Sequence, residues 1–126
     1  MSELRYNPFL QDWVIIDSNR QQRPNLPADW CPFCPGSGKV PEDYDVYVYD
    51  NDFPILRQEW QEASGYENDF FQAEKTYGKC EVILYHPNHI ITLSELTVSH
   101  IKKLVDLWCG RYEELSKDEK IKYIYF

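Results

Sequence analysis

The chain has 126 residues, of which 43% are hydrophobic and 27% are charged, and its formal net charge is −8. This length is typical of one domain, and the acidic balance argues against non-specific nucleic-acid binding, which needs a basic surface. The residues after Met1 do not resemble a signal peptide, and no apolar run approaches the ~20 residues of a membrane span, so we expect no membrane partner. Four cysteines, two of them in a metal-binding motif, fit a reducing cytoplasm better than a disulfide scaffold, so we expect a cytoplasmic protein.

The first part of the chain combines a turn, a strand and a loop with two arginines. Asn7-Pro8 predicts the turn, and the β-branched run 13–16 predicts the strand. Residues 18–30 contain prolines without hydrophobic periodicity, which is typical of a loop. Arg20 and Arg23 lie in this loop. Two guanidinium groups can hold a phosphate through forked hydrogen bonds, but two solvated surface arginines are the common alternative.

A tight cysteine turn follows, with the sequence Cys31-Pro32-Phe33-Cys34-Pro35-Gly36. Two thiols at this spacing form half of a tetrahedral zinc site, and the later segment His86-Pro87-Asn88-His89 offers imidazole ligands. A redox pair and two buried thiols are the alternatives. A redox pair is expected where a helix begins after a strand, and the prolines and glycine disfavour a helix here. The pattern therefore predicts a zinc site.

The middle of the chain predicts a strand and then a polar excursion. Residues 46–49 belong to an alternating, tyrosine-rich run that is typical of a strand. Asp50-Asn51-Asp52 follows directly and can form a turn, because such side chains bond to nearby backbone. Alternatively, a carboxylate at the end of the strand holds a ribose diol. Residues 57–79 are rich in acidic side chains, and we expect an exposed excursion with a short strand near Phe70-Phe71.

The last third predicts a strand, a long helix and a final strand. Residues 81–85 are mostly apolar, and Pro87 stops the strand. Residues 97–116 have apolar side chains at helical spacing, with Thr97 as the N-cap. Residues 121–126 are strand-like, and because the apolar run is still going at Phe126, we expect a longer protein.

These elements predict an α+β fold with a mostly antiparallel sheet. The long helix is expected to cover one face of the sheet through Ile101, Leu104 and Trp108. Cys80 and Cys109 are interpreted as buried thiols, and the whole of 1–126 as one domain.

Five pieces of sequence occur in an order that resembles a known family. They are Leu4–Pro8 with Trp13-Val14, Arg20 with Arg23-Pro24, Cys31–Gly36, Asp50–Pro54, and Pro87–His89 with Thr92-Leu93. Together they resemble the N-terminal part of the galactose-1-phosphate uridylyltransferase family, a branch of the histidine-triad superfamily. The resemblance covers essentially the whole sequence and implies a histidine-triad-like half-domain.

The resemblance implies an enzyme that exchanges UMP between UDP-glucose and galactose 1-phosphate, with UDP-galactose as the other nucleotide sugar, through a uridylyl-histidine intermediate. It also implies a homodimer. Carried over by position, the expected roles are zinc binding for Cys31, Cys34 and His89, phosphate contact for Arg20 and Arg23, and uridine binding for Asn51 and Asp52.

In the family, the nucleophile lies in a His-Pro-His segment, and the fourth zinc ligand lies in the same stretch. This sequence lacks that stretch. We therefore expect both beyond Phe126, and no catalytic residue within these 126 residues. His86 has no counterpart in the family and is a candidate fourth ligand in an isolated fragment. His100, beside the apolar stripe of the helix, is interpreted as a solvated or capping residue.

Two other functions remain open from the sequence. One is a related nucleotidyltransferase or phosphorylase of the same superfamily with adenine specificity. The other is a small non-catalytic module stabilised by zinc, in which His86 completes a closed site with Cys31, Cys34 and His89. The arginines and the Asn-Asp-Phe-Pro segment have no role in such a module.

Overall fold

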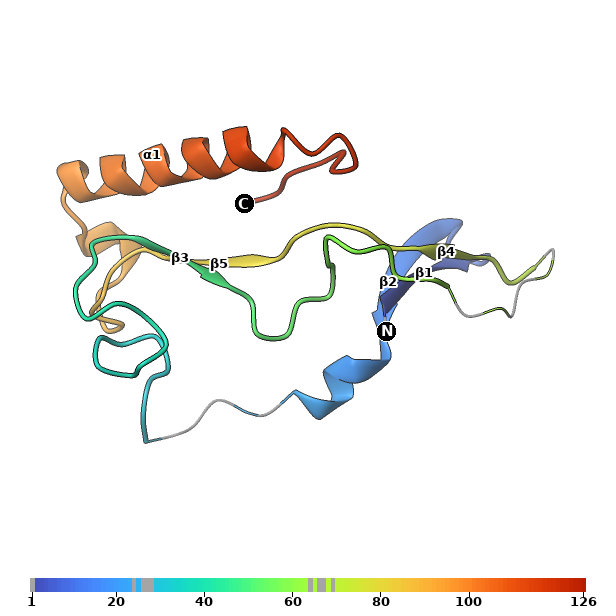
Figure 1. Ribbon diagram of the computed structural model, residues 1–126, viewed down its shortest axis with the longest axis horizontal. Helices are drawn as coiled ribbons and strands as arrows, with labels where there is room; N and C mark the ends of the chain where they lie inside the picture. The colour runs from blue at the N-terminus through green and yellow to red at the C-terminus, as the bar shows by residue number, and fades with distance from the viewer. Residues whose placement is uncertain (1, 24, 26–28, 64, 66–67, 69) are drawn as a thin grey trace. The chain divides into compact units, whose positions relative to one another are not determined.

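The computed structural model describes residues 2–23, 25, 29–63, 65, 68 and 70–126 (Figure 1). The chain divides into two compact units, each made of two separate stretches. The first unit comprises Met1–Pro24 and Asn51–Cys80, and the second comprises Asn25–Asp50 and Glu81–Phe126. Among the described residues, no helix is both long and apolar enough to cross a membrane.

The first unit contains a three-stranded antiparallel sheet with the order β2-β1-β4. Leu4 on the central strand lies opposite Ile15 on one neighbour and Glu74 on the other. A buried hydroxyl pair, Ser2 with Thr76, closes one end of the sheet at 2.9 Å. The strands are β1 (Ser2–Asn7), β2 (Asp12–Asp17) and β4 (Ala73–Lys75).

The predicted turn at Asn7-Pro8 is confirmed as the connection between β1 and β2. The side-chain oxygen of Asn7 accepts hydrogen bonds from the amides of Phe9 (3.1 Å) and Leu10 (3.2 Å). Gln11 completes the turn with a positive φ of 54°. An asparagine side chain thus replaces the backbone partners that the turn amides lack.

The predicted strand at 13–16 is confirmed as β2, but three details of this unit differ from expectation. β1 was not predicted, because its short run mixes charged and apolar side chains. The short strand expected near Phe70-Phe71 lies instead at β4, whose formation depends on pairing with β1. The loop 18–30 begins with a 3-10 helix, η1 (Ser18–Gln22), capped by the Asp17 carboxylate through the amide of Asn19 at 2.8 Å.

The second unit contains a two-stranded antiparallel sheet, β3 (Tyr47–Asp50) with β5 (Glu81–Leu84), which confirms both predicted strands. Tyr47 lies opposite Leu84, and Asp50 opposite Glu81. The α+β class and the antiparallel pairing are confirmed, but the strands belong to two separate sheets. A single sheet was expected because strand patterns carry no information about which strands pair.

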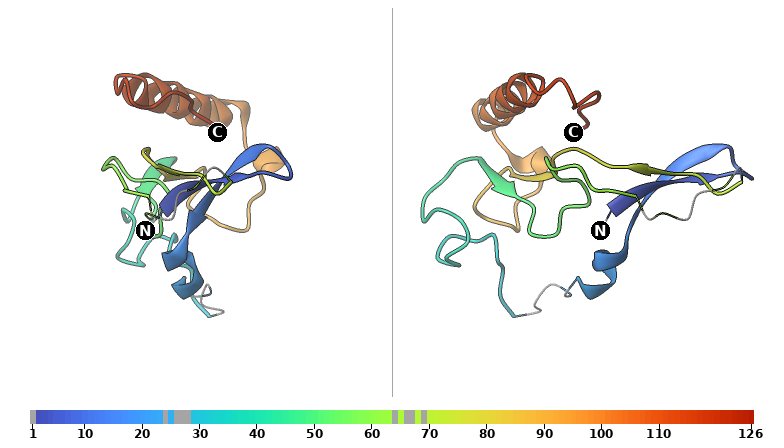
Figure 2. Two further views of the ribbon diagram at one scale, coloured as in Figure 1. Left: turned by 90° about the vertical axis from the view of Figure 1, so that its right-hand side faces the viewer. Right: turned by 45° about the vertical axis from the view of Figure 1, so that its right-hand side comes forward.

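The predicted helix is confirmed as α1 (Val98–Leu115), which follows the short 3-10 helix η2 (Leu93–Glu95). Both views in Figure 2, with Figure 1, show α1 running alongside the β3–β5 pair of its own unit. Leu104 on the helix is buried at 2% exposure, whereas Val98 is 84% exposed. The apolar stripe of α1 is therefore only partly covered.

Cys109 on α1 is exposed and Cys80 is half-buried, so the interpretation of both as buried thiols is wrong.

The strand expected at 121–126 is wrong, because no strand pairs with this segment in the described part of the chain. β-branched and aromatic side chains favour a strand only where a partner completes the hydrogen-bond ladder. Phe126 instead places its ring 6.1 Å from that of Trp108 on α1, while Tyr123 and Tyr125 are over 80% exposed, at 81% and 86%.

Replacing the cap of α1 should give a small, measurable loss of stability. Thr97 Oγ1 accepts a hydrogen bond from the amide of His100 at 3.2 Å, as the N-cap prediction requires. We expect Thr97→Ala to lower the free energy of unfolding by about 1 kcal/mol, because one helix amide loses its acceptor. Urea unfolding checks this, and Thr97→Ser, which keeps the acceptor, should match the parent. Equal stability of Thr97→Ala and the parent would show that the cap contributes nothing.

Candidate metal centre and nucleotide-binding residues

The cysteine motif forms a hydrogen-bonded turn in the second unit. The amide of Cys34 bonds to the carbonyl of Cys31 (3.4 Å), and the amide of Ser37 bonds to the carbonyl of Cys34 (3.1 Å). Gly36 has a φ of +84°, a conformation that favours glycine. No helix begins here, so the structure lacks the context expected of a redox pair, as the prolines predicted.

Two tyrosines that were not predicted as part of the site, Tyr44 and Tyr49, contact this turn. The hydroxyl of Tyr44 donates to the carbonyl of Phe33 (2.8 Å), between the two cysteines. The ring of Phe33 packs edge-on against that of Tyr49 on β3, with centroids 5.3 Å apart. Burial, and then the negative charges of the Cys34 and Cys31 thiolates, raise the pKa of Tyr44, which donates this hydrogen bond as a neutral hydroxyl.

The histidine half of the site lies in a turn after β5. The amide of Asn88 donates to His86 Nδ1 (3.0 Å), and the amide of Ile90 donates to the Asn88 side chain (3.0 Å). Pro87 cannot donate to a strand ladder, so the chain turns here. His89 lies within this turn, flanked on both sides by these local hydrogen bonds.

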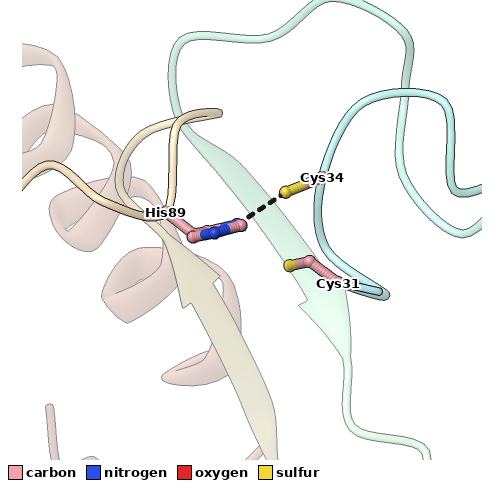
Figure 3. Close-up of side chains that lie close together, drawn as sticks. All are labelled: Cys31, Cys34 and His89. Carbon is pink, nitrogen blue, oxygen red and sulfur yellow. Dashed lines mark hydrogen bonds between the residues drawn. The ribbon is translucent and has the colours of Figure 1, made fainter. Parts of the chain in front are cut away.

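The structure brings the three predicted ligands together. One ligand atom each from Cys31, Cys34 and His89 lies within 4.8 Å of the others. Figure 3 shows the three side chains pointing toward one another, with His89 Nδ1 2.8 Å from Cys34 Sγ. His86 is not a member of this group, and its Nδ1 is occupied by the Asn88 amide. The site therefore does not have the four ligands that the closed-module alternative required.

The donor set fits a borderline-soft metal. Two thiols and an imidazole are the ligand types that zinc prefers. A hydrogen bond with the Cys31 side chain, followed by burial and by the Cys31 charge, raises the pKa of Cys34, while a backbone hydrogen bond at His89 lowers it. A metal that bound here would release protons, because a thiol binds a metal as the thiolate. A pocket of about 490 Å³ opens beside the ligands and is lined also by Trp30 and Phe33.

The two candidate phosphate-binding arginines lie in the first unit. Arg20 is in the last turn of η1, and the amide of Arg23 caps that turn through the carbonyl of Arg20 (3.1 Å). Both side chains are exposed. The 3-10 turn fixes the backbone between the two arginines.

The candidate uridine-binding residues come directly after β3 in the sequence, and they belong to the first unit. The side-chain oxygen of Asn51 accepts from the amide of Phe53 (2.9 Å), so the turn interpretation holds for Asn51. The amide of Asn51 bonds to the carbonyl of Cys80 (3.3 Å), which fixes the backbone on that side. Asp52 is exposed on this turn. The four candidate nucleotide-binding residues thus belong to one unit, and the three candidate metal ligands to the other.

Comparisons with known proteins agree with one another. Residues 1–126 match the family model described as galactose-1-phosphate uridyl transferase, N-terminal domain. A galactose-1-phosphate uridylyltransferase of Thermotoga maritima is 36% identical over 126 residues, which cover 99% of this chain and 40% of that protein. One of Rattus norvegicus is 31% identical over 130 residues, covering 89% of this chain and 34% of that protein.

The fold agrees as well. A solved uridylyltransferase structure superimposes with a TM-score of 0.79 at 24% identity, covering 96% of this chain and 37% of that one. The chain therefore spans well under half of the length of the relatives that it matches. The match of the whole sequence to the family model and the 36% identity to a named relative show that this chain belongs to the galactose-1-phosphate uridylyltransferase family, to whose N-terminal domain it corresponds.

Proposed function

We propose that the protein is a cytoplasmic, homodimeric galactose-1-phosphate uridylyltransferase. It exchanges UMP between UDP-glucose and galactose 1-phosphate and so releases UDP-galactose and glucose 1-phosphate. The observation that carries this proposal is the match of all 126 residues to the N-terminal domain of the family. The gathered cysteine and histidine ligands support it independently.

In this proposal Cys31, Cys34 and His89 hold a zinc ion. The ligands come from two stretches that are far apart in the sequence, 25–50 and 81–126, which together form the second unit. A zinc ion bound by such ligands supplies folding free energy. The metal thus has a structural role, joining the cysteine turn to the turn after β5.

The nucleotide is proposed to bind through the first unit. Arg20 and Arg23 neutralise the phosphates, which are anionic and accept forked hydrogen bonds. Asp52 accepts hydrogen bonds from the ribose hydroxyls, and Asn51 supports the uridine segment. The exposure of both arginines and of Asp52 supports these roles, because a ligand must reach each group.

The nucleophile is proposed to be a histidine other than the three in this sequence. One imidazole nitrogen attacks the α-phosphorus of UDP-glucose, the bond to glucose 1-phosphate breaks, and galactose 1-phosphate then displaces the histidine. The basis for this is the His-Pro-His segment that the family resemblance implies, which residues 1–126 do not contain.

A transfer assay tests the proposed reaction. The complete natural protein is incubated with radiolabelled UDP-glucose, with and without galactose 1-phosphate, and the acid-labile label on the protein is mapped. We expect UDP-galactose formation and label on a histidine outside residues 1–126. ADP-glucose in place of UDP-glucose tests the adenine alternative. Turnover with ADP-glucose alone, or label on His86 or His100, would contradict the proposal.

Removing the Asp52 carboxylate should weaken nucleotide binding. Hydrogen bonds to a charged group contribute roughly 1.5–3 kcal/mol, so Asp52→Ala should raise the Kd for UDP-glucose about tenfold or more. Titration calorimetry measures this. Glu62→Ala, which removes another exposed carboxylate from the same unit, is the matched control and should bind as the parent does. Unchanged affinity in Asp52→Ala would refute the ribose assignment.

A further inference from the structure

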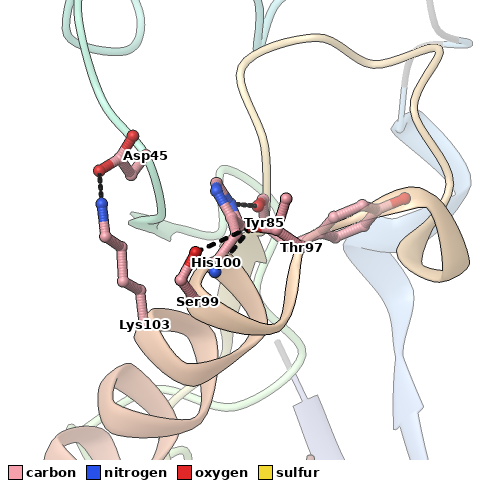
Figure 4. A network of polar contacts seen from close by, with 6 residues as sticks. All are labelled: Asp45, Tyr85, Thr97, Ser99, His100 and Lys103. Atoms are coloured by element: carbon pink, nitrogen blue, oxygen red, sulfur yellow. Dashed lines mark hydrogen bonds and ion pairs between the residues drawn. The ribbon is translucent and has the colours of Figure 1, made fainter.

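His100, in the first turn of α1, makes a contact outside its own helix. Its Nε2 lies 2.6 Å from the carbonyl oxygen of Tyr85 (Figure 4). A carbonyl can only accept, so the imidazole nitrogen donates. Tyr85 follows Leu84, whose pairing with Tyr47 is the last in the β3–β5 ladder. His100 thus takes a carbonyl just beyond the point where the sheet stops holding the chain.

The segment that follows Tyr85 carries the metal ligand His89. His86 places its ring 5.1 Å from the ring of His100, at an interplanar angle of 42°. The Nδ1 atom of His86 accepts a hydrogen bond from the amide of Asn88. His100 on the helix therefore contacts the start of the turn at two neighbouring residues, at the carbonyl of Tyr85 and at the ring of His86. The other hydrogen bonds of the turn are the contact of His89 with Cys34 and the local bonds within residues 88–91.

The same part of α1 also contacts the other stretch of this unit. Lys103, one turn after His100, forms an ion pair with Asp45 (Figure 4). Asp45 follows Tyr44, whose hydroxyl holds the cysteine turn at Phe33. The ion pair is exposed on both sides, so its own contribution is small. His100 itself is half-buried, and its hydrogen bond to the Tyr85 carbonyl is the more direct link to the turn that carries His89.

We propose that His100 is a positioning residue for the metal site. Its hydrogen bond to the Tyr85 carbonyl and its contact with the His86 ring hold the start of the 86–91 turn, so that His89 is directed toward Cys31 and Cys34 before the metal binds. This role rests on the zinc site proposed above. Groups that orient a metal ligand without touching the metal lower the cost of ordering that ligand and so raise affinity.

The effect is expected to be modest and specific to metal binding. Loss of one such hydrogen bond corresponds to about a two- to tenfold change in an equilibrium constant. His100→Phe keeps a ring beside His86 and removes the donor, so zinc affinity should fall by about three- to tenfold within that range. His100→Gln places an amide donor near the position of Nε2 and should restore most of the affinity.

The experiment measures zinc affinity in the complete natural protein by competition with a chromophoric chelator. The parent, His100→Phe and His100→Gln are compared with Lys102→Ala, which removes an exposed side chain from the same turn of α1 as a control. The cobalt(II)-loaded forms are compared by absorption, because the visible spectrum reports ligand geometry. Weaker binding and an altered spectrum in His100→Phe, both restored in His100→Gln, support the positioning role.

Equal affinities and spectra in all four proteins would overturn the role of His100 and leave the zinc site standing. An equal loss in His100→Phe and His100→Gln would also overturn it, because the donor would not be the cause. A parent that binds no zinc would overturn both proposals.

A second measurement needs no variant. By reciprocity, zinc should protect the His100 Nε2 proton from exchange with solvent in NMR spectra of the parent. Unchanged protection on adding zinc would count against the coupling even if His100→Phe failed to fold.

Discussion

Cys31→Ser is expected to abolish tight zinc binding and to lower the stability of the second unit more than any other single change considered. Structural zinc has an apparent binding free energy of roughly 10–16 kcal/mol in small domains, and that energy depends on thiolate ligands. Serine has nearly the same shape as cysteine but does not provide a thiolate. Since the ligands join stretches 25–50 and 81–126, the loss should appear as unfolding rather than as slower turnover alone.

Metal content and thermal unfolding check this result. Cys109→Ser is the matched control, because Cys109 is an exposed thiol in the same unit and lies outside the ligand group. The control should keep one zinc per chain and the Tm of the parent, whereas Cys31→Ser should lose the zinc and unfold at a much lower temperature. A Cys31→Ser protein with full zinc content and an unchanged Tm would remove Cys31 from the site.

Arg111→Met should also be strongly destabilising, because Arg111 joins α1 to β5 through a forked ion pair with Glu81. Arg111 Nε lies 2.9 Å from Glu81 Oε2, and Arg111 Nη2 lies 2.6 Å from Oε1. The two side chains are only 24% and 10% exposed. Removing the cation leaves a largely buried carboxylate without its charge partner, which costs about 3 kcal/mol or more.

Urea unfolding with two further variants separates this cause from simple loss of packing. Glu81→Gln combined with Arg111→Met removes the buried charge, and it should regain part of the lost stability. Lys102→Met breaks an exposed pair with Asp106, in which the side chains are 73% and 63% exposed, and should change stability by less than about 0.5 kcal/mol. An Arg111→Met protein as stable as Lys102→Met would show that the pair contributes little.

The cysteine half of the candidate metal site could be predicted from the sequence because its chemistry is local. Cys31 and Cys34 lie in one turn, and the prolines and Gly36 excluded a helix without reference to the rest of the fold. His89 was chosen over His86 only through the family resemblance. The structure supports this choice, because His86 Nδ1 is taken by the amide of Asn88.

Other features depended on partners that are distant in the sequence. β4 is a strand because β1 pairs with it, and the three residues Ala73–Lys75 carry no pattern of their own. Residues 121–126 have the pattern of a strand but pair with none of the described residues, so the same propensity gives no strand. The helix was predictable from Thr97 and the apolar spacing, whereas the contact of His100 with Tyr85 was not, since a single histidine beside an apolar stripe gives no sign of its partner.

Zinc-edge X-ray absorption of the purified protein tests the proposed metal site most directly. We expect one zinc per chain, with two sulfur ligands at about 2.3 Å and nitrogen at about 2.0–2.1 Å. Both sulfur ligands should persist in Cys109→Ser, and one should be lost in Cys31→Ser if any metal remains. A metal-free protein with both cysteines reactive toward a thiol reagent, or a zinc surrounded only by oxygen and nitrogen, would contradict the assignment of Cys31, Cys34 and His89.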